Sequence, residues 1–216
     1  MPGRAFMKSA VKAAFSKRPF TSLVCWHVSR SRPAVALTFD DGPTEHTPKV
    51  QAILKDFKVS PTFFILGNQV EKSPDIAEAV LRSGHEIGNH GFNHEKHDQK
   101  ELRLQVLQCR EILARYGVQT RLYRPPGGAL HPGTLLWLWR KRFTTVLWSF
   151  DALDSMRHES KWRGADPDFS AVRGGDIILM HDDNPVCVRD LPVMLEAVLK
   201  KGLRIVAVSS LIRSSD

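Results

Sequence analysis

The sequence predicts an α/β domain built on a parallel β-sheet. Short apolar runs, typical of buried strands, alternate along the chain with segments that carry helix signals. With 216 residues, 42% of them hydrophobic, the chain can bury one substantial core, and no repeat or linker divides it. The pattern alone does not distinguish a β/α barrel from an open doubly wound sheet.

The first strand is the apolar run Ala34-Val35-Ala36-Leu37, which leads to a Gly42-Pro43 stop. Further strands are expected near residues 62–66, 85–89, 144–150, 176–180 and 203–208. Pro48 stands in the first turn of a helix that runs to about Phe57, where its missing N–H costs nothing.

Three more helices are expected between the later strands. One begins at Ser73-Pro74-Asp75 and ends near Gly84. Asp98 and Glu101 resemble a capping box before a long helix over residues 102–116. A helix that begins at His131-Pro132 carries five apolar residues at 135–139, so we expect it to be buried on all sides.

Two adjacent carboxylates, Asp40 and Asp41, follow the first strand. In α/β folds the carboxyl ends of strands are the usual place for chemistry. Side chains alternate in extended chain, so these two should diverge and serve different roles around one centre. The alternative is a solvated turn, because Asp and Gly favour turns.

A histidine pair follows the strand expected at 85–89. His90 and His94 are four residues apart. Imidazoles with one carboxylate commonly hold catalytic zinc and leave one position open for water. The spacing of the histidines alone is weak, since any helix with two histidines can show it. Together with Asp41 after the first strand, it favours a metal site made of Asp41, His90 and His94.

The chain resembles the polysaccharide deacetylase family, also called carbohydrate esterase family 4, at five places in the same order. These are Thr38-Phe39-Asp40-Asp41-Gly42-Pro43, His90-Gly91-Phe92-Asn93-His94, Arg124-Pro125-Pro126-Gly127-Gly128, Asp151-Ala152-Leu153-Asp154 and Leu179-Met180-His181-Asp182. The resemblance spans residues 33–213. It implies that residues 33–216 form a catalytic domain folded as a distorted, incomplete (β/α) barrel.

The resemblance also implies a metal-dependent hydrolase that removes an N-linked acyl group, with acetyl expected, from an amino sugar. Asp41, His90 and His94 would bind a divalent metal, with zinc expected and cobalt or nickel as alternatives. Asp40 would be the general base that takes a proton from the attacking water. Arg124 would keep Asp40 ionised and aimed.

The remaining matched residues would act on the acyl group and the leaving amine. His181 would be the general acid, oriented and charged by Asp151. The backbone N–H of Gly127 would stabilise the oxyanion, and Leu179 would line a pocket for the acyl methyl group.

Three positions depart from the family pattern and leave the substrate open. Gly91 stands where Ser or Thr is common, Gly127 where an aromatic residue is common, and Ser155 where Trp is common. The substrate is expected to be an oligosaccharide, a polysaccharide or a lipid-linked saccharide. Alternatives are a metal-dependent amidase for a small non-sugar amide and a catalytically silent carbohydrate-binding domain. A phosphatase is disfavoured because its D-x-D spacing is missing.

The positive charge is concentrated at the N-terminus. Residues 1–32 hold seven basic and no acidic side chains, whereas the rest of the chain is nearly neutral. This segment is expected to form an amphipathic helix that either lies on an anionic membrane surface or docks on the barrel. We expect no nucleic-acid partner, because the catalytic part has almost no net charge and no binding motif.

The sequence predicts a cytoplasmic location, at the inner membrane face if the N-terminus binds lipid. No apolar stretch approaches a membrane span, and charges interrupt the N-terminal segment where a secretory signal needs an apolar core. The three cysteines have no metal-finger spacing and are expected to be reduced. Export is the alternative, since many members of the family are exported.

Overall fold

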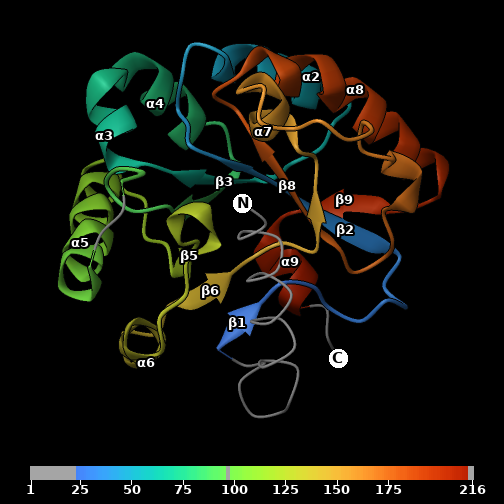
Figure 1. The fold of residues 1–216 in the computed structure, drawn as a ribbon. Coiled ribbons are helices and arrows are strands. Elements are labelled where there is room, and N and C mark those ends of the chain that lie inside the picture. The colour runs from blue at the N-terminus through green and yellow to red at the C-terminus, as the bar shows by residue number, and fades with distance from the viewer. Residues whose placement is uncertain (1–22, 96–97, 214–216) are drawn as a thin grey trace.

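The computed structural model describes residues 23–95 and 98–213. Within these residues nine strands form one sheet, and every pair of neighbouring strands is parallel (Figure 1). The strands are β1 (Val24–Cys25), β2 (Ala34–Asp40), β3 (Thr62–Ile65), β4 (Glu86–Asn89), β5 (Leu122–Tyr123), β6 (Thr144–Val146), β7 (Phe150–Asp151), β8 (Ile177–His181) and β9 (Arg204–Val206). The predicted α/β class with a parallel sheet is confirmed.

The sheet is curled and incomplete. Its order is β1-β6-β5-β4-β3-β2-β8-β7, with β9 beside β2, and no pairing joins β1 to β7 in the described chain. The helices form an arc outside the curled sheet, from α5 through α4 and α2 to α8 (Figure 1). This arrangement confirms the incomplete (β/α) barrel and excludes the open doubly wound sheet.

Eight helices are described, and the four predicted from the sequence are among them. The eight are α2 (Thr47–Asp56), α3 (Gly67–Lys72), α4 (Pro74–Leu81), α5 (Gln99–Arg115), α6 (Pro132–Arg140), α7 (Asp154–His158), α8 (Pro185–Lys200) and α9 (Val208–Arg213), with short 3-10 turns η2 (Pro126–Gly128) and η3 (Phe169–Ala171). The Asp98 carboxylate accepts a hydrogen bond from the Glu101 backbone N–H at 2.9 Å, so the predicted N-cap of α5 is present.

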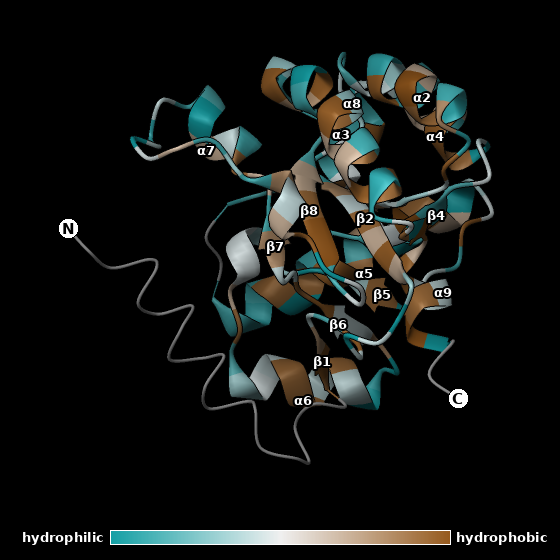
Figure 2. Cartoon of the chain, turned by 90° about the vertical axis from the view of Figure 1, so that its right-hand side faces the viewer, coloured by the Kyte–Doolittle hydropathy of each residue, from teal (hydrophilic) through white to brown (hydrophobic). Residues whose placement is uncertain are grey.

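Strand β2 occupies the centre of the sheet, and all seven of its residues are buried. Its last residue, Asp40, pairs in register with Phe64 of β3 and with His181 of β8. Figure 2 shows hydrophobic residues on β2 and β8 and hydrophilic residues on the outward faces of the surrounding helices. The apolar core therefore holds the carboxyl ends of β2 and β8 side by side.

Two predicted elements differ from the structure. The strand expected over 144–150 is two strands, because β6 pairs with β5 and β1 while β7 pairs with β8. Helix α6 is not buried on all sides: Leu135 and Leu138 are buried, but 44% of Leu136 and 56% of Trp139 are exposed. Only one face of α6 packs against the domain. The apolar residues on its outer face are exposed to solvent.

Some residues that precede the predicted domain start at residue 33 also contact the sheet. Val24 and Cys25 pair with β6, and the Arg30 guanidinium forms an ion pair with buried Asp176. The amphipathic helix predicted within residues 1–32 falls mostly on residues 1–22, which lie outside the described residues. Among the helices that are described, none combines the length and the apolar character needed to cross a bilayer.

Candidate active site

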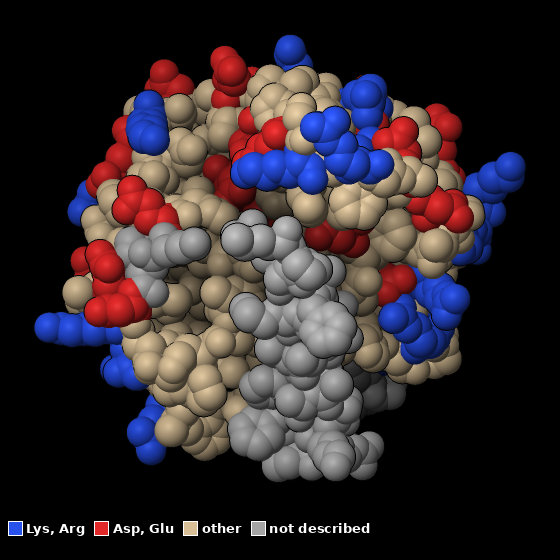
Figure 3. Space-filling view, in the orientation of Figure 1, with Lys and Arg blue, Asp and Glu red and all other residues tan. Residues whose placement is uncertain are grey.

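The sequence motifs converge at the carboxyl ends of neighbouring parallel strands. Asp40 ends β2, His181 ends β8, and His90 follows the last residue of β4. Figure 3 shows acidic side chains inside a hollow near the middle of this face, with basic side chains along its upper edge. Parallel pairing explains the convergence, since it places all carboxyl ends at one edge of the sheet.

Asp41, His90 and His94 form a cluster suited to a metal ion. One ligand atom of each lies within 4.8 Å of the others. Asp41 Oδ1 is 3.4 Å from His90 Nε2 and 3.8 Å from His94 Nε2. The His90 side chain is buried, whereas 47% of the His94 side chain is exposed, so the cluster is open to solvent on the His94 side.

The hydrogen bonds of His90 determine which of its nitrogens is available as a ligand. His90 Nδ1 lies 2.7 Å from the Arg124 carbonyl oxygen, which can only accept, so Nδ1 carries a proton. In the neutral imidazole, Nε2 then carries the lone pair and is the nitrogen that can bind a metal ion. His90 Nε2 and Asp41 Oδ1 are both buried, and neither has a hydrogen-bond partner among the described residues.

Asp41 Oδ1 and His90 Nε2 are both acceptor atoms and lie 3.4 Å apart in a buried site. They repel each other unless a positive charge lies between them. Burial opposes ionisation of Asp41, but His90, His181 and His94 hold its pKa well below its usual value. Burial likewise lowers the pKa of His90, but Asp40 and Asp41 raise it above its usual value. The site therefore favours a cation, and the three donors fit a divalent metal with nitrogen and oxygen ligands.

Asp40 lies beside this cluster and is paired with Arg124. Arg124 Nη1 donates to Asp40 Oδ1 at 2.7 Å, and the other carboxylate oxygen lies 3.7 Å from His90 Nε2. The guanidinium is fully buried and also donates to Thr38 Oγ1 and to the carbonyls of Val146 and Leu147. Arg124 thus places a fixed positive charge directly against the Asp40 carboxylate.

His181 is held by Asp154 and not by Asp151, which is a correction of the predicted pairing. His181 Nδ1 lies 3.0 Å from Asp154 Oδ1, and the His181 backbone N–H donates to Asp154 Oδ2 at 2.7 Å. The Asp151 oxygens accept hydrogen bonds from Trp148 Nε1 and from the Leu153 N–H. Asp151 pairs with Leu179, which is two residues before His181. Leu153 has a left-handed backbone, and the chain turns there so that α7 starts with Asp154 at the end of β8.

The charge of Asp154 sets the protonation of His181. Burial alone would lower the pKa of His181, but the charge and hydrogen bond of Asp154, with smaller contributions from Asp41 and Asp40, raise it to about 10. His181 is therefore protonated near neutral pH. The sequence contains the signal that could have identified Asp154, because it is the second acidic residue of the Asp151-Ala152-Leu153-Asp154 motif.

The two residues predicted to contact the acyl group lie in different surroundings. Leu179 is 2% exposed and lies on the same face of β8 as His181, two residues away. Gly127 lies in η2 with φ 59°, and a Cβ at this position would meet no atom within 4 Å. The space that an aromatic side chain often fills in the family is therefore open here.

The chain is similar to known proteins over most of its length. The sequence model of the family described as polysaccharide deacetylase matches residues 27–142. A peptidoglycan-N-acetylglucosamine deacetylase of Bacillus cereus is 32% identical over 208 residues, which cover 89% of this chain and 94% of that protein.

Solved structures show the same fold. The crystal structure of a peptidoglycan N-acetylglucosamine deacetylase in complex with 4-naphthalen-1-yl-N-oxidanyl-benzamide superimposes with a TM-score of 0.79 at 30% identity, over 90% of this chain and 97% of that one. A carbohydrate esterase family 4 pseudoenzyme from Bacillus anthracis has a TM-score of 0.76 at 21% identity, over 88% of this chain and 68% of that one. Since a pseudoenzyme shares this architecture, an argument for catalysis has to rest on the side chains of the site.

Proposed function

This chain belongs to the polysaccharide deacetylase family, and on that premise we propose that it removes the acetyl group from N-acetylglucosamine residues of a cell-wall glycan. The reaction is hydrolysis of an amide: water adds to the carbonyl carbon, the C–N bond breaks, and acetate and a free amino sugar leave. The observation that carries the proposal is the buried, unsatisfied pair of Asp41 Oδ1 and His90 Nε2, flanked by Asp40 and His181.

Asp41, His90 and His94 would hold the metal, and we propose zinc because it suits two imidazoles and a carboxylate with one position left open. When bound, the metal polarises the amide carbonyl and lowers the pKa of the attacking water. The exposed edge of His94 leaves the cluster open on the side from which a glycan can approach.

Asp40 and His181 carry the two proton transfers. Asp40, held in place by the hydrogen bond from Arg124, accepts a proton from the attacking water. His181 arrives protonated, because Asp154 raises its pKa to about 10, and gives its proton to the departing amine. The proposal is supported by the register of β2 and β8, in which Asp40 and His181 are paired residues on adjacent strands. The Gly127 N–H is proposed to donate to the developing oxyanion.

The test is release of acetate by the purified full chain from three substrates: N-acetylglucosamine oligomers, purified peptidoglycan and its lipid-linked precursor. We expect release from at least one of them, its loss with a chelator, and its return with zinc. A small aromatic acetamide in parallel tests the amidase alternative. Hydrolysis of that amide alone, or glycan binding without acetate release, would contradict the proposed deacetylation of a glycan.

The cellular location decides between polymer and precursor. The cytoplasmic location predicted from the sequence gives access to the lipid-linked precursor. We propose the cytoplasm as the working site, with residues 1–22, the part of the basic segment that precedes β1, in contact with the membrane surface. Fractionation of cells that produce the full chain, with and without residues 1–22, tests this. Recovery outside the cell would favour the polymer instead.

A further inference from the structure

Asp182, the residue after the proposed general acid, is bound to the loop that carries the metal ligand Asp41. Its backbone N–H donates to the Asp40 carbonyl at 3.3 Å, and its own carbonyl accepts from Thr44 Oγ1 at 2.6 Å. Its carboxylate Oδ2 accepts from Thr47 Oγ1 at 2.5 Å. Three hydrogen bonds thus connect Asp182, the residue after β8, to Asp40 before the loop at 41–47 and to Thr44 and Thr47 within it.

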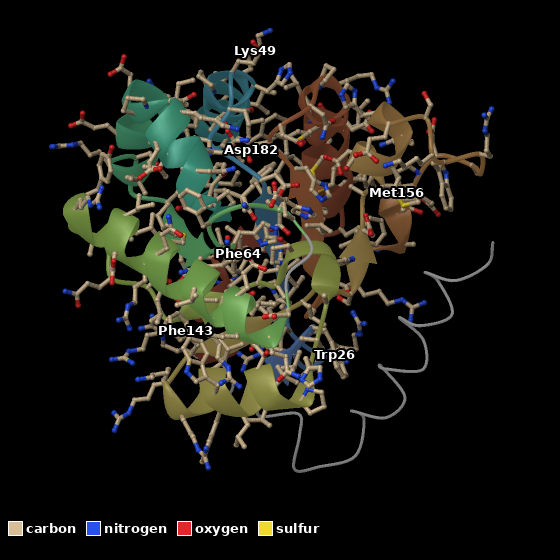
Figure 4. The ribbon with its side chains drawn as sticks, turned by 60° about the vertical axis from the view of Figure 1, so that its left-hand side comes forward. Trp26, Lys49, Phe64, Phe143, Met156 and Asp182 are labelled. Carbon is tan, nitrogen blue, oxygen red and sulfur yellow. The ribbon has the colours of Figure 1, made fainter. Side chains whose placement is uncertain are left out.

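Thr47 extends this connection into the loop itself. Its Oγ1 donates to Asp182 and accepts from the Thr44 backbone N–H at 2.7 Å. Asp182 is 1% exposed and Thr47 is fully buried, so water does not compete for these bonds. Figure 4 shows Asp182 inside the molecule, below the helix that presents Lys49 outward and above Phe64.

The Asp182 carboxylate also occupies the space next to Gly42. A Cβ on residue 42 would lie 2.3 Å from Asp182 Oδ2 and 2.4 Å from Oδ1, far inside van der Waals contact. Glycine at 42 is therefore required by this carboxylate. The Asp182 carboxylate thus packs against the backbone of Gly42, the residue directly after the proposed metal ligand Asp41.

Asp41 needs such support because its backbone is left-handed, with φ 76°. Non-glycine residues adopt this region uncommonly, although Asp does so more readily than most, and the surroundings have to stabilise it there. The direction of the Asp41 carboxylate follows from this backbone conformation. A loop that relaxed would turn Oδ1 away from His90 and His94.

We infer that Asp182 is a positioning residue that holds the 41–47 loop so that Asp41 can ligate the metal together with His90 and His94. The inference rests on the metal site of the proposed function, but it concerns binding of the metal and not the chemistry that follows. Groups that orient metal ligands typically contribute about 10- to 100-fold to metal affinity or activity.

The experiment is titration of metal-free protein with zinc, with no substrate present. Asp182→Ala is expected to weaken zinc binding by about 10- to 100-fold. Asp182→Asn keeps the shape of the side chain and an oxygen that can accept from Thr47. Its zinc affinity should therefore stay within about threefold of wild type, a much smaller change than the loss expected for Asp182→Ala. Glu45→Ala is the matched control: it removes an 88%-exposed carboxylate from the same loop and should leave zinc affinity unchanged.

A second pair of variants tests the contact if Asp182→Ala does not fold. Thr47→Val removes the hydroxyl at nearly constant shape and should weaken zinc binding in the same direction. Gly42→Ala should also weaken zinc binding, because its Cβ would clash with the Asp182 carboxylate. If Asp182→Ala folds and binds zinc with wild-type affinity, the inference is overturned. If Asp182→Ala does not fold, wild-type zinc affinity in Thr47→Val overturns it.

The readout separates this inference from the proposed function. A wild-type protein that binds zinc but releases no acetate would contradict the deacetylase proposal and leave the comparison of affinities intact. A merely structural role for Asp182 would lower the melting temperature of the metal-free variants without changing zinc affinity once folded, and that result also counts against the inference.

Discussion

His181 Nδ1 lies 3.0 Å from Asp154 Oδ1, and the same carboxylate accepts the His181 backbone N–H through its other oxygen. This two-point contact fixes the ring relative to its own backbone and raises the pKa of His181 to about 10, against the opposing effect of burial. The imidazole is therefore presented to the site as an acid, with Nε2 free to face a leaving group.

Replacement of Asp154 by Asn should remove the charge that keeps His181 protonated. The pKa of His181 then falls, because burial is opposed only by Asp40 and Asp41, and the high-pH limb of kcat/KM should move to lower pH. At neutral pH we expect a loss of about 10²- to 10⁴-fold, the usual contribution of a general acid. A pH–rate profile checks this, and an unchanged alkaline limb would contradict the pairing. Asp151→Asn is the comparison variant and should not move that limb.

The same pair makes a stability prediction with a definite sign. The pKa of His181 in the folded protein, about 10, lies above its ordinary value of 6.5. The stabilisation is therefore complete below about pH 6.5 and is lost as the pH rises toward 10. Denaturation of metal-free wild type and Asp154→Asn should show the largest difference at mildly acidic pH and a smaller one at pH 10. A difference that grows with pH would show that the assignment is wrong.

Asp40 and His90 should separate chemistry from metal binding. Asp40→Asn removes the base but no proposed ligand, so turnover should fall by about 10²- to 10⁴-fold while zinc remains bound. His90→Ala removes a ligand, so both zinc and turnover should be lost. Metal content by elemental analysis, measured beside acetate release, distinguishes the two. A fully active Asp40→Asn would exclude Asp40 as the base.

Arg124 should matter for stability as well as activity. Arg124→Met leaves Asp40 buried beside a neutral side chain, and breaking a buried ion pair in this way costs about 3–5 kcal/mol. The double variant Arg124→Met/Asp40→Asn removes both charges and should recover part of that loss. Urea denaturation measures the free energies of unfolding. Equal stability of the single and double variants would mean that the charge of Asp40 is not what Arg124 compensates.

Zinc binding should stabilise the fold and depend on pH. Zinc at 100 times its dissociation constant adds about 2.7 kcal/mol to the free energy of unfolding, so chelation should lower the melting temperature. Burial lowers the pKa of His90, but Asp40 and Asp41 raise it above the usual value, so protons compete with zinc at higher pH than for a free histidine. Calorimetry in two buffers should detect the released proton. Zinc affinity independent of pH would contradict the ligand role of His90.

The predictable part of this protein is local in sequence. The apolar run that ends at Asp40-Asp41, the alternation of strands and helices, and the histidines after β4 follow from side-chain periodicity and turn residues, which neighbouring residues determine. Because the strands are parallel, the same local pattern also predicts that residues at their carboxyl ends meet at one edge. The placement of Asp41, His90 and His94 in one cluster agrees with that reasoning.

Tertiary structure alone decided which acid holds His181, which side of α6 faces solvent, and what lies against Gly42. Asp151 and Asp154 are three residues apart and chemically alike, and the left-handed turn at Leu153 selects Asp154. Asp182 and Gly42 are 140 residues apart, and their contact depends on the register of β2 against β8. Contacts of this kind are set by register and turn angles between distant segments, and side-chain periodicity carries no information about either.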